Sequence, residues 1–151
     1  MNQIAAGGKN LCILDDNGHP SCLSGPLQTY LKSRNRSRAL PSLVGLSVGP
    51  TFACGLHKKS KHVFCFGERA LDLPLPAGPM KQVSVGGLHA CAVDVKGALS
   101  CFGLRDVFQQ VKNAPSGNFV EVAAGQSHSC ALDDEGAVHC WGANTRGQCM
   151  P

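Results

Sequence analysis

The chain has 151 residues, enough for one domain or one array of small units, and it contains 18 glycines, 9 cysteines, 5% aromatic and 16% charged residues. A glycine-rich, aromatic-poor composition is typical of short strands joined by tight turns, not of long amphipathic helices. The formal charge of +4 does not by itself indicate a nucleic-acid partner, and we expect neither a membrane span nor a signal peptide in this sequence.

Four segments of the chain align with one another: residues 4–25, 44–67, 83–103 and 120–142. Each unit begins as an apolar strand that ends at glycine, and a short loop then leads into a strand with a cysteine. A turn and a second cysteine strand, which also ends in glycine, complete the unit. The leading cysteines are spaced by 42, 37 and 39 residues. This spacing predicts an all-β repeat protein with one repeat domain over residues 1–151.

The first, third and fourth units share one turn chemistry. Gly18, Gly97 and Gly136 each stand at the last position of a three-residue hairpin loop, where the backbone is left-handed and glycine is favoured. Closing the fourth loop over residues 134–136 places Cys130 directly opposite Cys140. The same register holds in the first and third units. Directly opposite positions are somewhat too far apart for a disulfide, so we expect the strands to pinch locally.

The second unit departs from this pattern. Ten residues separate Cys54 from Cys65, where the other units have nine, and the sequence HKKSKH replaces the glycine turn. We expect the longer loop to avoid the left-handed position and so to need no glycine. We also expect an exposed basic loop at Lys58, Lys59 and Lys61.

Eight of the nine cysteines fall into pairs within units, and Cys149 is left unpaired. Four pairs at matched hairpin positions favour disulfides over reduced, buried thiols. Zinc is disfavoured because no close CxxC pair is present, although histidines flank several cysteines. Persistent disulfides indicate an oxidising compartment, which could be extracellular or an organelle lumen such as the thylakoid or secretory lumen. The predicted pairs are Cys12–Cys22, Cys54–Cys65, Cys91–Cys101 and Cys130–Cys140.

Residues 30–39 form a basic segment that we predict to be a linker between the first two units. With the lysines of the second-unit loop, this segment holds 7 of the 14 basic residues. Two interpretations stay open: a solvated linker, or a patch that contacts an acidic protein surface, acidic lipid or nucleic acid. Nucleic acid is disfavoured because Tyr30 is the only aromatic residue there. The candidate contact residues are Lys32, Arg34, Arg36, Arg38, Lys58, Lys59 and Lys61.

Residues 125–148 resemble the repeat of the regulator of chromosome condensation family. The family pattern is an apolar strand, Gly, His-x-Cys-Ala, a Gly turn and then Trp/Phe-Gly-x-Asn-x-x-Gly-Gln. The fourth unit carries the pattern whole, and the third keeps it up to Gly103. The first two units keep less, and neither has the Asn-x-x-Gly-Gln tail. The resemblance implies β-propeller blades, and the cysteine pairs resemble variants found in secreted proteins and receptor ectodomains.

Family members usually have seven blades, so four units imply an open arc or a small closed ring. An open arc would expose its end faces, starting at Ile4 and ending near Trp141. The leading function is a non-catalytic protein–protein interaction or scaffold module, an accessory or structural subunit of a larger assembly. The alternatives are a nuclear regulator, acting by nucleotide exchange on a small GTPase or by chromatin attachment, and an enzyme with a loop-borne site.

We expect no catalytic, cofactor-binding or metal-binding residues. The Asp15–Asp16 and Asp133–Asp134 pairs occupy hairpin turns, where aspartate is a common structural choice. His89 and His128 stand at equivalent repeat positions, which favours a structural role over ligand binding.

Overall fold

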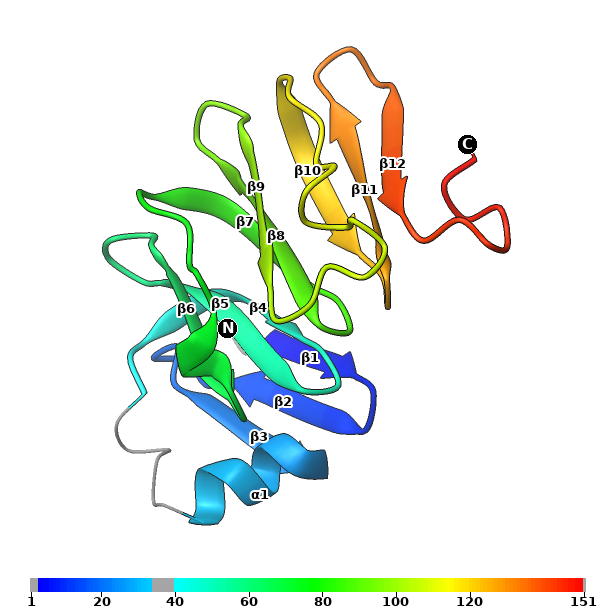
Figure 1. Cartoon of the computed structure of the whole chain (residues 1–151). Coiled ribbons are helices and arrows are strands. Elements are labelled where there is room, and N and C mark those ends of the chain that lie inside the picture. Colours follow the sequence, from blue (N-terminus) through cyan, green and yellow to red (C-terminus); the bar gives the residue numbers. More distant parts are fainter. Residues whose placement is uncertain (1–2, 34–39, 151) are drawn as a thin grey trace.

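The computed structural model describes residues 3–33 and 40–150, which fold into four three-stranded antiparallel sheets. Each sheet is a meander in chain order, and the sheets stand side by side as blades of an open arc (Figure 1). Blade 1 comprises β1 (Gln3–Gly7), β2 (Asn10–Leu14) and β3 (Pro20–Ser24), and blade 2 comprises β4 (Leu43–Val48), β5 (Phe52–His57) and β6 (Val63–Gly67). Blade 3 comprises β7 (Met80–Val85), β8 (His89–Asp94) and β9 (Leu99–Gly103), and blade 4 comprises β10 (Phe119–Ala124), β11 (His128–Asp133) and β12 (Val138–Gly142).

The hairpins have the register that the turn chemistry predicts. The cysteines of every unit are directly opposite partners, as in the Cys130–Cys140 pair of blade 4. Gly18, Gly97 and Gly136 have φ angles of 86°, 89° and 91°, so each occupies the left-handed position assigned to it. The position of the turn glycine therefore determines the length of the hairpin loop, and the loop length determines which residues of the two strands are paired.

The turn of blade 2 corrects one expectation. The longer loop does not avoid the left-handed conformation, because Lys61 adopts it with φ of 61°. Its carbonyl accepts a hydrogen bond from the backbone N–H of Met80, the first residue of the next blade, at 2.9 Å. A contact between blades therefore holds a lysine in a conformation that usually favours glycine. The expected exposure of Lys58, Lys59 and Lys61 is present.

The core is divided among the spaces between neighbouring blades. Three apolar clusters fill these spaces, centred on buried residues such as Leu46, Phe52 and Val122. Each cluster joins residues from the outgoing face of one blade to residues from the incoming face of the next. A blade is therefore stabilised chiefly by its neighbours, as in other repeat arrays.

A helix, α1 (Gly25–Ser33), follows blade 1 and was not predicted from the sequence. Pro26 fits the first turn, and the Asn10 side-chain oxygen accepts a hydrogen bond from the Leu27 N–H at 2.9 Å. Leu27 and Leu31, four residues apart, are buried on one side of the helix. The helix occupies residues 30–33 of the predicted linker, and residues 34–39 lie outside the described part of the chain. No helix in the described residues is long and apolar enough to span a membrane.

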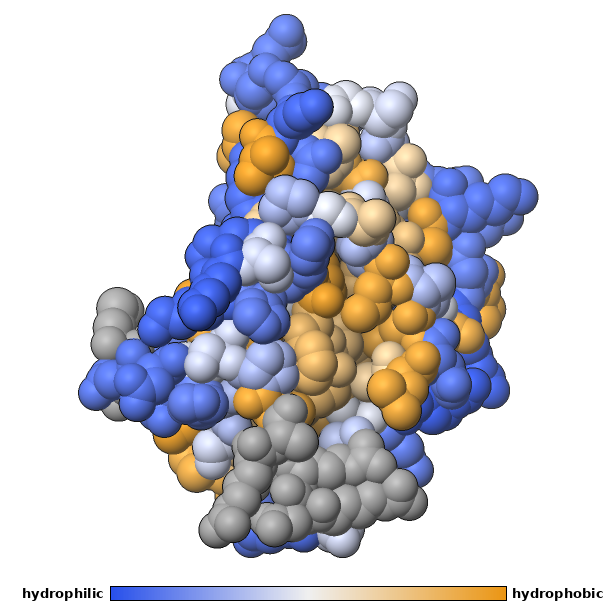
Figure 2. Space-filling model, turned by 90° about the vertical axis from the view of Figure 1, so that its left-hand side faces the viewer, coloured by the Kyte–Doolittle hydropathy of each residue, from blue (hydrophilic) through white to orange (hydrophobic). Residues whose placement is uncertain are grey.

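One side of the molecule exposes a group of apolar atoms (Figure 2). Figure 2 shows apolar atoms gathered in the middle of one side, which lies at the left of Figure 1, with hydrophilic atoms around them. The short 3₁₀ helix η2 (Ala70–Asp72), which follows β6, carries Leu71, whose side chain is 90% exposed.

Candidate functional site

Each blade contains one disulfide, at the four pairs expected from the repeat. The Cα–Cα distances are 3.9, 4.1, 4.0 and 4.0 Å, which shows the expected local pinching of the strands. The disulfide of each of the first three blades lies on the face that meets the following blade, and the leading cysteines Cys12, Cys54 and Cys91 are fully buried there.

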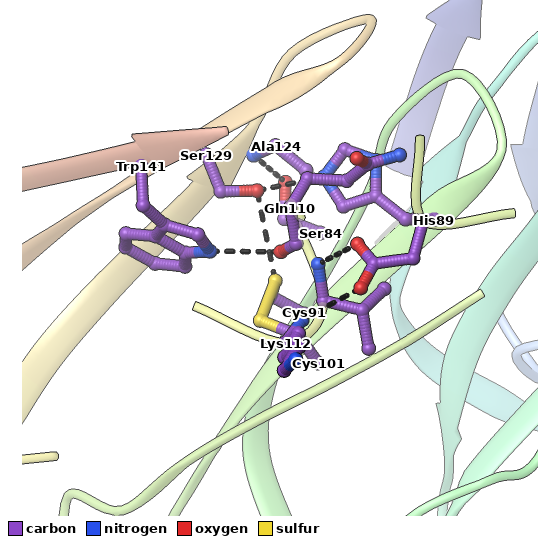
Figure 3. Close-up of a disulfide and its surroundings, with 11 residues drawn as sticks. Ser84, His89, Cys91, Cys101, Gln110, Lys112, Ala124, Ser129 and Trp141 are labelled. Carbon is purple, nitrogen blue, oxygen red and sulfur yellow. Dashed lines mark hydrogen bonds between the residues drawn. A yellow bond between two sulfur atoms is a disulfide. The ribbon is translucent and has the colours of Figure 1, made fainter. Parts of the chain in front are cut away.

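The interface between blades 3 and 4 shows how a disulfide face is covered (Figure 3). The Ser129 hydroxyl of blade 4 lies 2.7 Å from His89 Nε2 and 3.6 Å from Cys91 Sγ. The Trp141 indole N–H donates a 2.8 Å hydrogen bond to the carbonyl of Gln110, in the segment after β9. The Ser129 hydroxyl, His89 Nε2 and the Trp141 indole N–H are therefore paired across the interface, whereas the buried His89 Nδ1 has no hydrogen-bond partner in the described part of the chain.

His89 is fully buried in this interface. Burial, together with a smaller contribution from charge repulsion by the nearby His128, lowers its pKa to about 4. The imidazole is therefore neutral at neutral pH and serves as a hydrogen-bonding partner within the interface. The structure thus gives this repeat position a packing role.

Two kinds of polar contact recur between blades. The first joins the left-handed turn residue to the first strand of the next blade: the carbonyls of Gly18 and Gly97 accept the N–H groups of Leu43 and Phe119, each at 2.8 Å. The equivalent contact in blade 2 is the one made by Lys61. This contact fixes the position of each blade against the next one at the turn end.

The second recurring contact comes from the first strand of a blade. The Gln82 amide donates to the Val122 carbonyl at 2.9 Å and accepts the Val122 N–H at 2.8 Å, and Gln3 makes the same pair of bonds with Leu46. The serine hydroxyls of Ser47 and Ser84 accept one N–H each from the following blade, at 2.9 Å. These glutamines and serines were not singled out from the sequence, although their positions recur in the repeat.

Within the described residues no blade covers the disulfide face of blade 4, which is open. Cys130 and Leu132 are both part-exposed, whereas their equivalents in the other blades are buried. Val138 is 49% exposed, while its blade 2 equivalent, Val63, is 7% exposed. We call this surface the outgoing end face; it comprises Glu121, Ala123, Cys130, Leu132, Val138 and Cys140.

Blade 1 is open on its opposite side. Ile4 is 70% exposed and Leu23 is 52% exposed, while the residue equivalent to Leu23 in blade 2, Phe66, is 2% exposed. We call this surface the incoming end face; it comprises Ile4, Ala6, Leu11, Ile13 and Leu23. The expected exposure at Ile4 is therefore present, but the expectation at Trp141 is wrong. Trp141 faces blade 3 and is 7% exposed, so the open surface lies on the other face of its sheet.

Comparison with known proteins assigns the repeat. Residues 119–148, which include all of blade 4, match the model of the Regulator of chromosome condensation (RCC1) repeat. This match assigns blade 4 to the RCC1 repeat, and the other three blades share its three-stranded, disulfide-closed fold.

Solved structures show the same blade arrangement. The CRINKLY WD40 ectodomain of the Arabidopsis thaliana receptor kinase ACR4 is 22% identical, with a TM-score of 0.70 over 93% of this chain and 49% of that one. The ectodomain of the Physcomitrella patens receptor kinase CR4 is 23% identical, with a TM-score of 0.71 over 92% and 40%. Yeast RCC1 (Prp20), solved with Kap60 bound, is 20% identical, with a TM-score of 0.70 over 94% and 43%. The chain thus spans less than half the length of each.

Four of the seven candidate contact residues lie on exposed parts of the described chain. Lys32 is exposed in the last turn of α1, and Lys58, Lys59 and Lys61 are exposed in the β5–β6 turn. Lys58 Nζ lies 3.5 Å from the Asn17 carbonyl of the neighbouring blade 1 turn. The remaining three candidates, Arg34, Arg36 and Arg38, lie outside the described residues.

The hairpin aspartates have structural partners. Asp15, Asp94 and Asp133 each accept backbone N–H groups from the residues two and four positions later, at 2.7–3.0 Å. For Asp15 and Asp94 a backbone hydrogen bond is the main cause of a lowered pKa, while for Asp133 it is the hydrogen bond from His139. In residues 3–33 and 40–150, no group of three or more His, Cys, Asp or Glu side chains is placed to hold a metal ion.

Cys149 is the free cysteine of the described chain. Its Sγ lies 3.2 Å from the Ala143 carbonyl, and burial raises the pKa of the thiol. A raised pKa lowers the thiolate fraction at neutral pH and so makes a nucleophilic role less favourable.

A groove of about 1050 Å³ lies between α1 and the segment after β6. Its walls include Tyr30, Leu71 and Leu104, together with the charged residues Glu68 and Arg105. The groove is formed by loops that follow three of the RCC1-like blades, so it depends on how those blades are set side by side.

Proposed function

We propose that this chain is a non-catalytic protein-interaction module, an accessory or structural subunit of a larger assembly. The observation that carries the proposal is the pair of open end faces. Among the described residues, Val122 and Val63, which correspond to Ile4 and Val138, are 2% and 7% exposed between blades, whereas Ile4 and Val138 are exposed at 70% and 49%. Apolar sheet faces of this kind are stabilised by burial, which a protein partner can supply.

The proposed setting is an oxidising compartment, either extracellular or an organelle lumen. Support comes from the four disulfides, since such bonds persist where glutathione and thioredoxin do not reduce them. The disulfides tie together the strands that carry the end faces, so these faces are offered on rigid sheets. A rigid surface loses less conformational entropy when it binds than a flexible one does.

We further propose that the exposed lysines contact an acidic surface of the partner. Lys58, Lys59 and Lys61 lie on one turn, and the chain carries a net charge of +4. Exposed charges of this kind steer association and change its rate more than its final affinity. Replacing the three lysines with glutamates should therefore slow association and reduce its dependence on salt concentration.

Site-specific photo-crosslinking tests the proposed function. A photoreactive amino acid is placed at position 23 or 138, on the two end faces, and at position 95 as the control. Val95 is also exposed, at 65%, but it lies in the β8–β9 turn away from both faces. In the producing cells, we expect crosslinks to a protein from positions 23 and 138 and none from position 95. An equal yield from all three positions, or no crosslink at all, would contradict the proposal.

A further inference from the structure

We propose that the groove between α1 and the segment after β6 binds a peptide segment of a partner protein, with apolar side chains of the peptide in the groove and one charged residue of each sign at its rim. This site is separate from the two end faces, so it adds a second binding surface to the proposed function. All residues that line the groove lie between positions 26 and 105, in the first three blades and the segments that follow them.

The groove has room for several side chains of a peptide. Its volume of about 1050 Å³ lies at the upper end of the range for small-ligand pockets, about 300–1,000 Å³. Its apolar walls include Leu71 from η2, Leu88 from the β7–β8 loop and Leu104 from the segment after β9. Leu71 is 90% exposed, and the Leu104 N–H donates a 2.9 Å hydrogen bond to the Leu88 carbonyl. An apolar side chain that packs on these leucines would remove their exposed surface from water and so stabilise the complex.

Hydrogen bonds between blades hold the floor of the groove in one shape. The Asn10 amide of blade 1 donates to the carbonyls of Gly49 and Pro50 in the β4–β5 loop, at 2.8 and 3.1 Å. The oxygen of the same side chain accepts a backbone N–H from the first turn of α1. The Thr51 hydroxyl continues this network by donating to the Gly87 carbonyl of blade 3 at 3.0 Å. A groove that is already ordered loses little conformational entropy when a peptide binds.

The blade 3 side of the groove carries a positive charge at Arg105. Within the described residues, its guanidinium group makes no hydrogen bond or ion pair. The carboxylate of the adjacent Asp106 is engaged elsewhere, because its two oxygens accept backbone N–H groups five and six positions later, at 2.7 and 3.1 Å. A guanidinium group pairs well with a carboxylate, so an acidic residue of the peptide would be favoured beside Arg105.

The blade 2 side carries the opposite charge at Glu68. This residue is exposed directly after β6 and forms no ion pair within residues 3–33 and 40–150. The next residue, Arg69, is held by Asp72 at 3.3 Å, so these two charges neutralise each other. The rim therefore offers one unpaired charge of each sign, on segments that follow different blades. A complementary peptide carries a basic residue for Glu68 and an acidic residue for Arg105, with apolar residues between them.

Selection from a displayed library of random dodecapeptides tests the proposal on the purified chain with its disulfides intact. We expect the enriched peptides to share one acidic and one basic residue separated by large apolar side chains. Synthetic copies of these peptides should bind in the micromolar range by fluorescence anisotropy. A library that yields no enriched peptide, or only peptides without this charge pattern, would overturn the proposal.

Two aspartate variants locate the bound peptide. Leu71→Asp should weaken binding at least about tenfold, because it removes apolar surface from the groove and places a carboxylate there. Val95→Asp is the matched control, since Val95 is 65% exposed but lies in the β8–β9 turn and does not line the groove. The control should bind with an affinity within about twofold of the wild type. Equal losses in the two variants would contradict the proposed site.

Reversal of one charge tests the predicted ion pair. Arg105→Glu should weaken binding at least about fivefold, and a peptide whose acidic residue is replaced with lysine should recover most of that loss. Lys96→Glu makes the same change of charge in the β8–β9 turn and should have little effect. A loss that the reversed peptide does not reduce would contradict the pairing. Leu71 and Arg105 are both exposed, and unchanged near-ultraviolet circular dichroism would verify that the variants fold.

Three further outcomes separate this groove from other surfaces and occupants. A dimer in light scattering that Leu71→Asp dissociates would make the occupant a second copy and overturn the peptide proposal. A failed peptide selection, together with photo-crosslinks from positions 23 and 138, would overturn the groove and leave the proposed function standing. Peptides that bind as predicted, with no crosslink from those two positions, would support the groove and count against the end faces as binding surfaces.

Discussion

At the scale of single residues, the left-handed turn position does more than close a hairpin. The carbonyl of this residue accepts the first N–H of the next blade, which explains why Lys61 adopts a conformation that glycine supplies elsewhere. Gly18 lies so close to blade 2 that an added Cβ would meet the Leu43 carbonyl oxygen at 2.6 Å, while the same position in blade 4, Gly136, faces open space. A residue chosen for local geometry thus also sets the spacing between blades.

We predict that Gly18→Ala is more destabilising than Gly136→Ala. Both substitutions force a left-handed φ on alanine, which costs about 1–2 kcal/mol. In Gly18→Ala the new Cβ would also push the β2–β3 turn away from the backbone of Leu43. The free energy of unfolding of this variant should therefore fall by at least a further ~1 kcal/mol. Urea denaturation with the disulfides intact measures the difference. Equal losses for the two variants would show that the turn glycine acts only locally.

His89 makes stability depend on pH. Its pKa is about 4 in the folded chain and 6.5 in the unfolded chain, so between these values the unfolded state binds more protons. Stability should be fully present above about pH 6.5, fall as the pH drops to about 4 and lose up to about 3 kcal/mol in that window. The turn aspartates titrate below this window because the pKa of each is lowered from 3.8.

The variant His89→Phe isolates this effect, since blade 2 carries Phe52 at the equivalent position. We expect thermal unfolding of the wild type to shift to lower temperature between pH 7 and pH 4.5, and the shift to be clearly smaller in the variant. Identical pH dependence in both proteins would assign the effect to other groups.

At the scale of elements, each blade is a hairpin of its second and third strands, joined by a disulfide, and its first strand pairs with the second. Only three strands and one disulfide form each sheet, so each blade has little core of its own. The bulk of the apolar burial lies between blades. The consequences of losing a disulfide should therefore depend on whether a neighbouring blade covers it.

We predict that replacing the cysteines of blade 3 with alanine costs more than the same change in blade 4. Both disulfides close the same sequence separation of 10 residues, so the entropic contribution of about 2–3 kcal/mol is shared. Cys91 is fully buried against blade 4, so its loss also leaves a cavity that should cost about 1–2 kcal/mol more. Chemical denaturation of Cys91→Ala/Cys101→Ala and Cys130→Ala/Cys140→Ala compares them, and a larger loss in blade 4 would contradict the burial argument.

The sequence predicted the elements whose causes are local. Hairpin register followed from Gly18, Gly97 and Gly136, and the cysteine pairs followed from that register. The helix α1 was missed because its stabilising contacts are not local. The side chain that accepts a hydrogen bond at its N-terminus belongs to Asn10 in β2, and its buried leucines pack against blade 2. Likewise, the roles of Gln82 and Ser84 depend on backbone groups about 40 residues away, which no local pattern reveals.

At the scale of the whole molecule, four RCC1-like blades make an arc with two apolar ends. Within the arc, every outgoing face is covered by the next blade. The ends break this pattern at Cys130 and Val138 on one side and at Ile4 and Leu23 on the other. The same residue types that stabilise the inside of the arc are therefore available at its ends for binding.

The proposed compartment predicts the oxidation state of the whole chain. Protein taken from its native source and denatured without reductant should show one free thiol, from Cys149, of the nine cysteines. Thiol titration gives this count directly, and full reduction of the same sample supplies the control value of nine. A native count of nine would place the chain in a reducing compartment and favour the nuclear alternative.

Carbene footprinting of the native assembly tests most directly whether the end faces are the interaction surfaces of this molecule. The labelling of Leu23 and Val138 is compared between the native assembly and the isolated, diluted chain, with Val95 as the exposed reference in the same sample. We predict strong protection of Leu23 and Val138 in the assembly and unchanged labelling of Val95. Equal labelling of the two end-face residues in both states would contradict the account.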